Sequence, residues 1–193
     1  MLILASQSPR RREILTMLGY NFLCKPADAD ETIPQSTPPE AAVQLLARRK
    51  AEAVSCNPED VVLGSDTVVA LENRILGKPR DEREAAEMLR ALSGKCHTVH
   101  TGVCLKNAEK CTVFAVPTLV EFFPLTEEEI AAYIATGDPM DKAGAYGIQG
   151  IGAVNVRRID GDFFTVMGLP AAQTARALRD FEIYPTPPAA SKY

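Results

Sequence analysis

The sequence predicts an α/β fold built on a mixed β-sheet with flanking helices. Apolar runs typical of strands and amphipathic stretches typical of helices follow one another, but without the strict alternation that produces a purely parallel sheet. With 193 residues, 46% of them hydrophobic and 24% charged, the chain is long enough to bury a core without disulfides or metals. We expect one domain over residues 1–183 and a flexible tail over residues 184–193, where prolines and small side chains dominate.

The first part of the chain predicts a strand, a helix, a second strand and a loop. Residues 2–5 form a short apolar run that indicates a buried strand. The helix that follows has Ser8 as its N-cap and Pro9 at its first position. Residues 21–24 favour a second strand, and residues 25–39 carry four prolines and several acids, which indicates a loop.

The remaining elements follow from apolar periodicity, caps and turn residues. They are a helix over residues 40–54, a strand over 61–71 interrupted at 64–67, a return strand ending at 77, a helix capped at 81 and ending at 92, two paired strands over 98–105 and 112–123, a helix from the Thr126–Glu129 capping box to Gly137, a hairpin over 154–158 and 163–167, and a last helix over 170–181. Residues 143–152 are rich in glycine and predict a hinge.

Charge and cysteine content exclude several classes of protein. A formal net charge of −4 argues against nucleic-acid binding by the surface as a whole, so any anion must be bound by local clusters of Lys and Arg. Five cysteines without a C-x-x-C pair favour free thiols over a zinc site or a disulfide framework. Because neither a signal peptide nor an apolar run of about 18 residues is found, we expect a soluble, cytoplasmic protein with no membrane and no nucleic-acid partner.

The first turn of the first helix concentrates positive charge. Arg10, Arg11 and Arg12 stand where a helix N-terminus favours acids, and each costs about 0.3–1 kcal/mol there. The conflict is removed when an external anion binds the free N–H groups of that turn, with the hydroxyls of Ser6 and Ser8 as further donors. We therefore favour a phosphate site here over the alternative, a solvated basic turn.

A second anomaly is Asp66, which lies between the apolar triplets 61–63 and 68–70. A carboxylate without a partner is costly to bury in such a strand. We therefore expect Asp66 to coordinate a metal, pair with a cation or act as a base. The alternative is an ordinary carboxylate in a turn at the end of a strand.

Three other charged residues are weaker signals on their own. Lys50 suits the end of a helix, and Lys78 suits a turn. Glu31 lies in an acidic loop in which Asp28 and Asp30 compete for any role. Neither a P-loop nor a dinucleotide-binding fingerprint is present.

Five segments complete a recognisable pattern. They are ASQSPRRREIL at residues 5–15, LARRKA at 46–51, GSDTVV at 64–69, GKPRD at 77–81 and DKAGAYGIQG at 141–150. In order and content they resemble the Maf family of nucleoside triphosphate pyrophosphatases, over nearly the whole chain. The unbroken AGAYGIQG is similar to the branch that acts on dTTP and UTP rather than the branch that acts on 7-methyl-GTP.

The resemblance implies an elongated fold with two lobes around a cleft, a divalent cation (Mg²⁺ or Mn²⁺), and hydrolysis of a nucleoside triphosphate to the monophosphate and pyrophosphate. It implies Asp66 as the catalytic residue and, together with Glu31, as a metal ligand. The implied substrate-binding residues are Ser6, Ser8, Arg11, Lys50 and Lys78, and the implied specificity residues are Arg10, Thr67 and Gln149. Ser65 departs from the alanine that the family often has at this position, and Asp30 competes with Glu31 for the acidic-loop role.

Two other functions stay open. One is a purine-directed house-cleaning pyrophosphatase, which shares a similar fold, and the other is a nucleotide-sensing regulator of septum formation that binds without turnover. The complete set of an acid and several cations favours catalysis on a small-molecule nucleoside triphosphate. The sequence leaves the oligomeric state open, with a homodimer as one option.

Overall fold

The computed structural model describes residues 1–186 of the protein and contains a seven-stranded mixed sheet. Of the predicted tail, residues 187–193 lie outside the described residues. The strands are β1 (Leu2–Leu4), β2 (Phe22–Cys24), β3 (Val61–Leu71), β4 (Arg74–Leu76), β5 (Cys96–Lys106), β6 (Cys111–Phe122) and β7 (Val156–Asp160). Their order is β2-β1-β3-β5-β6-β7, with β4 paired to β3. β1 is parallel to β2 and β3, and the other pairs are antiparallel, which confirms the predicted mixed sheet.

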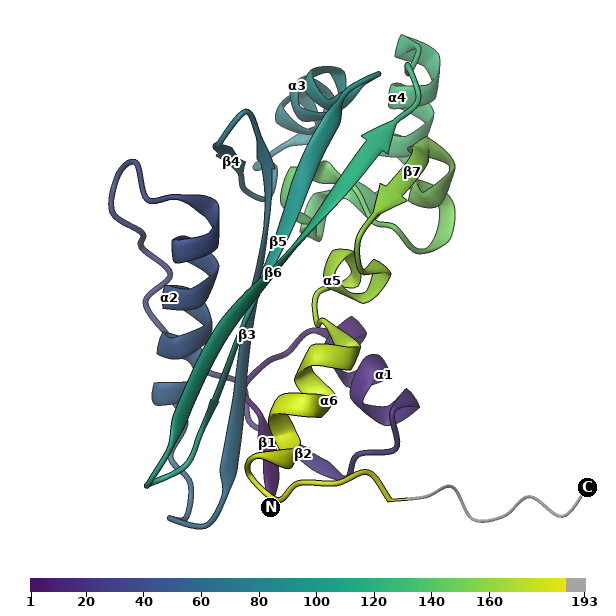
Figure 1. Ribbon diagram of the computed structural model, residues 1–193. Helices are drawn as coiled ribbons and strands as arrows, with labels where there is room; N and C mark the ends of the chain where they lie inside the picture. The colour runs from purple at the N-terminus through teal and green to yellow at the C-terminus, as the bar shows by residue number, and fades with distance from the viewer. Residues whose placement is uncertain (187–193) are drawn as a thin grey trace, which may run out of the picture.

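Helices cover both faces of this long, twisted sheet (Figure 1). They are α1 (Pro9–Met17), α2 (Pro39–Glu52), α3 (Glu82–Leu92), α4 (Glu127–Ala135), α5 (Phe163–Met167) and α6 (Ala171–Arg179), with short 3-10 helices η1 (Asp138–Asp141), η2 (Ala143–Ala145) and η3 (Gly150–Asn155). The predicted caps are confirmed, because Ser8 accepts from the Arg11 N–H and Thr126 and Glu129 form a capping box. Among the described residues, no helix is long and apolar enough to cross a membrane.

Three apolar cores hold the helices to the sheet. α2 packs alone on one face, where Ala47 and Ala51 meet Ile3 and Val62. On the other face, α1, α5 and α6 cover one end of the sheet and α3 and α4 cover the other, each group with its own core. The two cores on this second face correspond to the two predicted lobes.

The sheet has an opening in the edge of β3 at the GSDTV segment. On that edge, β1 pairs with Val61–Leu63 and β4 pairs with Val69–Leu71. No strand of the described residues pairs with residues 64–68 on that side, although β5 continues to pair with them on the other. Side chains from both faces of the sheet can therefore meet at this opening.

Two predicted elements are wrong. β3 is a continuous strand and is not interrupted at residues 64–67. Residues 163–167 form helix α5 instead of the second strand of a hairpin, because Asp162 caps the N–H groups of Phe164 and Thr165. Gly168 then ends the helix with a φ of 118°, and an Asp N-cap followed by a C-terminal glycine is a helix signal that the sequence offered.

The close contact between α2 and β5 depends on Gly102. A Cβ at this position would lie 2.3 Å from the Val43 carbonyl oxygen and 2.9 Å from the Gln44 nitrogen, both of them backbone atoms of α2. Gly102→Ala is therefore expected to lower the free energy of unfolding by at least about 2 kcal/mol, since the helix must move away from the sheet. Urea denaturation measures this change.

The matched control for that measurement is Gly77→Ala, because a Cβ at residue 77 would meet no atom within 4 Å. Its unfolding midpoint should stay close to that of the wild type. Equal destabilisation of the two variants would contradict the packing argument.

Candidate active site

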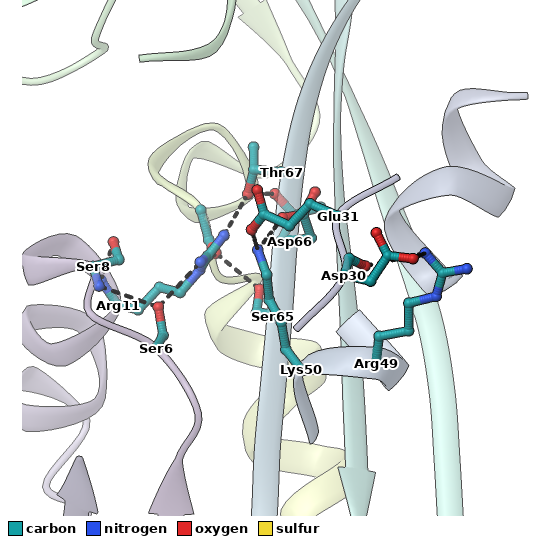
Figure 2. A network of polar contacts seen from close by, with 12 residues as sticks. Ser6, Ser8, Arg11, Asp30, Glu31, Arg49, Lys50, Ser65, Asp66 and Thr67 are labelled. Carbon is teal, nitrogen blue, oxygen red and sulfur yellow. Dashed lines mark hydrogen bonds and ion pairs between the residues drawn. The ribbon is translucent and has the colours of Figure 1, made fainter. Parts of the chain in front are cut away.

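Most of the residues predicted to carry chemistry meet at the opening in β3 (Figure 2). Ser6 and Ser8 lie on the connection from β1 to α1, and Arg11 lies in the first turn of α1. Lys50 is near the end of α2, and Asp66 and Thr67 lie in the middle of β3. Segments that are far apart in the sequence therefore supply one site.

Arg11 points inward from α1 and joins three parts of the chain. Its Nε donates to the Gly168 carbonyl at 2.8 Å, its Nη1 to Ser6 Oγ at 3.2 Å and its Nη2 to Thr67 Oγ1 at 3.1 Å. All three acceptors are neutral, and burial lowers the pKa of the Arg11 guanidinium, although the charge of Asp66 opposes that effect. The guanidinium is therefore a fixed positive charge with further N–H donors available to an anion.

The two serines support this turn. Ser6 is buried, and its Oγ accepts from the Ser8 N–H at 3.1 Å as well as from Arg11. Ser8 is half-buried and caps α1. Arg12, by contrast, is exposed on the outer face of the helix.

A row of polar groups beneath Arg11 separates the two cores on this face of the sheet. Thr67 Oγ1 lies 2.9 Å from Thr101 Oγ1, which in turn donates to the Thr165 carbonyl at 2.7 Å. The buried Ser65 donates its hydroxyl to the Gly168 carbonyl at 3.2 Å. Sequence reasoning missed Thr101 and the Gly168 carbonyl, because both gain their role only when α5 packs against β5.

Asp66 is paired with a cation, as one of its three predicted roles requires. Lys50 Nζ lies 2.5 Å from Asp66 Oδ1 and 2.8 Å from Glu31 Oε1. The Lys50 and Asp66 side chains are only 14% and 13% exposed, whereas the Glu31 side chain is 67% exposed. The hydrogen bond from Lys50 is the main cause of a lowered pKa at Glu31, and the charges of Lys50, Lys78 and Arg11 add to it.

The structure separates the two acids that compete in the loop before α2. Asp30 Oδ1 accepts from the Thr32 N–H at 2.9 Å, and its other carboxylate oxygen pairs with Arg49 at 3.5 Å. Glu31 instead reaches Lys50 at the opening in β3 (Figure 2). Glu31 is therefore the loop acid that lies beside Asp66.

Three predicted residues lie outside this hydrogen-bonded network. Lys78 is exposed and follows β4, where the Gly77 carbonyl accepts from the Gly144 N–H at 3.0 Å. Arg10 and Gln149 are half-buried. Burial opposes ionisation of Asp141, but the hydrogen bond and charge of Lys142, and to a smaller extent the charge of Arg10, lower its pKa.

The glycine-rich stretch that contains Gln149 forms η2, part of η3 and the turn between them, and it is tied to α4. Tyr133 of α4 donates its hydroxyl to Asp138 at 2.7 Å and accepts from the Gly147 N–H at 3.1 Å. Lys142 donates to the carboxylates of Asp138 and Asp141 at 3.0 and 2.7 Å. These contacts hold the backbone that leads into Gln149.

The site combines a fixed guanidinium, a lysine and two carboxylates around an opening in a mixed sheet, which suits a protein that binds phosphate together with a cation. The sequence matches the family described as Maf-like protein over residues 1–181, and the chain belongs to that family. This result confirms the resemblance that its motifs carry.

Individual relatives are similar along almost their whole length. A dTTP/UTP pyrophosphatase from Bacillus velezensis is 50% identical, with 94% of this chain and 97% of that protein covered. A dTTP/UTP pyrophosphatase from a Geobacillus species is 52% identical, with coverages of 92% and 96%. Among solved structures, a HAM1 protein from Coxiella burnetii superimposes with a TM-score of 0.47 and 18% identity, over 80% of this chain and 79% of that chain.

Proposed function

We propose that this protein hydrolyses dTTP and UTP to the nucleoside monophosphate and pyrophosphate. The observation that carries the proposal is the convergence of Arg11, Lys50 and the carboxylate of Asp66 at one opening in β3. Relatives that are about half identical and bear that activity in their names support the choice of substrate.

The carboxylates at the site suit a divalent cation, Mg²⁺ or Mn²⁺. Asp66 and Glu31 converge on one positive charge, the Lys50 ammonium, so their oxygens already face a common point. Among residues 1–186, no cluster of three or more His, Cys, Asp or Glu side chains could hold a metal by itself. Two carboxylates fit Mg²⁺, which typically takes one or two of them and completes its coordination with water and substrate phosphates. When bound, such an ion would neutralise charge on the phosphates.

The cations of the chain would bind the triphosphate. Arg11 is held by three neutral acceptors, so its remaining N–H donors can meet phosphate oxygens without any change of its own position. Lys50 and Lys78 supply further positive charge near the same carboxylates. Ser6 and Ser8 complete the phosphate-binding turn as hydroxyl donors.

Asp66 would position and deprotonate the attacking water. The water oxygen forms a bond to the α-phosphorus, the bond from that phosphorus to the oxygen that bridges to the β-phosphate breaks, and pyrophosphate leaves. Arg11 and the lysines stabilise the negative charge that develops on the leaving group. No covalent enzyme intermediate is required in this scheme.

Base selectivity is assigned to Gln149, with Arg10 and Thr67 as supporting positions. Uracil and thymine present an N–H donor between two carbonyl acceptors, and a side-chain amide held in one orientation can pair with that pattern. The hydrogen bonds of Tyr133 and Lys142 support a fixed backbone just before Gln149. Thr67 would act through Arg11, because its hydroxyl oxygen accepts a hydrogen bond from the Arg11 guanidinium.

A panel of nucleotides, assayed for pyrophosphate release with Mg²⁺ and with Mn²⁺, tests this function. We expect dTTP and UTP to be the preferred substrates, CTP to be slower and purine triphosphates to be poor. Faster hydrolysis of deaminated purine triphosphates or of methylated GTP would assign a different substrate. Nucleotide binding without any pyrophosphate release would favour the regulator.

Gln149→Ala is expected to flatten the preference for UTP over CTP. The variant loses the amide that pairs with the base. An unmade buried hydrogen bond typically costs about 1–3 kcal/mol, which corresponds to a change of roughly five- to 150-fold in the selectivity for UTP over CTP. The ratio of kcat/KM values for the two substrates measures the effect. An unchanged ratio would remove Gln149 from base recognition.

The proposal includes a cytoplasmic location, which the five free cysteines of the chain support. A homodimer stays a prediction, and light scattering of the purified protein checks it.

A further inference from the structure

Lys50 occupies the position that joins the two carboxylates proposed to hold the divalent cation. Its ammonium contacts Asp66 and Glu31 at once, from the end of α2, and the contact with Asp66 is largely shielded from solvent. Figure 2 shows the end of the Lys50 side chain meeting both acids. The ammonium therefore fills the place in which these carboxylates would share an ion.

A metal ion shared by Asp66 and Glu31 would lie close to this ammonium, which already contacts one oxygen of each carboxylate. Such an ion needs an oxygen of each carboxylate in its own coordination shell, at about 2.0–2.1 Å for Mg²⁺. Two like charges this close repel each other strongly in a poorly solvated site. Lys50 must move away before both carboxylates can hold the ion.

Lys50 can make this movement, whereas Arg11 cannot. The lysine ends a flexible four-carbon stem, and one of its partners, Glu31, lies on an exposed loop and is 67% exposed. Arg11 is fixed by hydrogen bonds to three separate segments. A bound triphosphate would offer Lys50 new negatively charged partners on the side where Arg11 already stands.

We propose that Lys50 acts as an internal counter-ion that blocks the metal site until a nucleotide draws it onto the phosphates. This inference rests on the proposed function, since it uses the same site. Because coupling between two ligands is reciprocal, metal and nucleotide must then strengthen each other's binding. The free enzyme binds metal weakly, and the complex with nucleotide binds it tightly.

Mn²⁺ binding, followed by electron paramagnetic resonance of the free ion, tests the proposal without turnover. The titration is run with and without a UTP analogue whose α–β bridging oxygen is replaced by nitrogen. In the wild type, the analogue should tighten Mn²⁺ binding by about tenfold or more, as expected when the competent state is a minor one. Lys50→Met should bind Mn²⁺ tightly without the analogue and lose most of that coupling.

Two control variants separate competition from a general change in charge. Arg48→Met removes one positive charge from an exposed position on the same helix, outside the opening in β3, and should leave the coupling in place. Lys50→Arg keeps a cation between the carboxylates and should keep Mn²⁺ binding weak in the absence of nucleotide. Thermal melts establish that each variant is folded.

Tight Mn²⁺ binding by the free wild type, or equal coupling in the wild type and Lys50→Met, would overturn the proposal. The pyrophosphate assay on UTP is read separately. An absence of turnover with the coupling intact would overturn the proposed function alone, and turnover without coupling would overturn the role of Lys50 alone.

Discussion

Asp66→Asn is expected to lower kcat on UTP by about 100-fold or more, because the variant can neither accept a proton from water nor hold a cation as firmly. Asparagine has nearly the same shape, and Lys50 keeps Glu31 as a partner, so the fold should be retained. The measurement is pyrophosphate release at saturating UTP, together with a thermal melt of each protein.

The matched control for Asp66 is Asp30→Asn. Asp30 is also an acid beside α2, but it bonds to the Thr32 N–H and to Arg49 outside the opening in β3. Asp30→Asn should hydrolyse UTP at a rate within about twofold of the wild type. A rate above about a tenth of wild type for Asp66→Asn would remove Asp66 from the chemistry.

Arg11→Ala should reduce kcat/KM for UTP by about 100- to 1,000-fold, the usual effect of losing a fixed donor that stabilises developing charge. The loss should affect binding as well as turnover, because the same guanidinium would contact the phosphates before and during the reaction. Arg11→Lys should restore little activity, since one ammonium cannot reproduce three hydrogen bonds that diverge to Ser6, Thr67 and Gly168.

Arg12→Ala provides the comparison, because Arg12 is the next residue of α1 and is exposed. The two variants carry the same change in net charge and the same loss of an arginine from the first turn. Arg12→Ala should match the wild type within about twofold. Similar losses in both variants would mean that the turn acts only through its overall charge.

Much of the fold could be predicted from local signals. Ser8, Asp81 and Thr126 each begin a helix as predicted, because capping depends on residues only a few positions apart. The hairpin predicted over residues 154–158 and 163–167 was wrong because a local cap signal was overlooked. Its apolar residues fit a strand, but the Asp162 cap and the C-terminal Gly168 make a short helix that packs on β5 and β6.

The sequence could predict which residues form the site but not which of them contact one another. The basic turn at Arg10–Arg12 and the acid within apolar β3 stand out in the sequence, since each conflicts with its local surroundings. Lys50 and Glu31 cause no such conflict, so only the family resemblance singled them out. Nothing local indicated that the two would meet at Asp66.

The sequence by itself determined the family, the class of fold, most of the helices and strands, and the residues that carry the charge. The tertiary structure alone decided that Glu31, not Asp30, reaches Lys50, and that Arg11 is held by the Gly168 carbonyl. It also decided that Lys50 lies between the two carboxylates. The physical reason is that caps and periodicity act within a few residues, whereas the partner of a shielded charge depends on where α1, α2, β3 and the end of α5 come together.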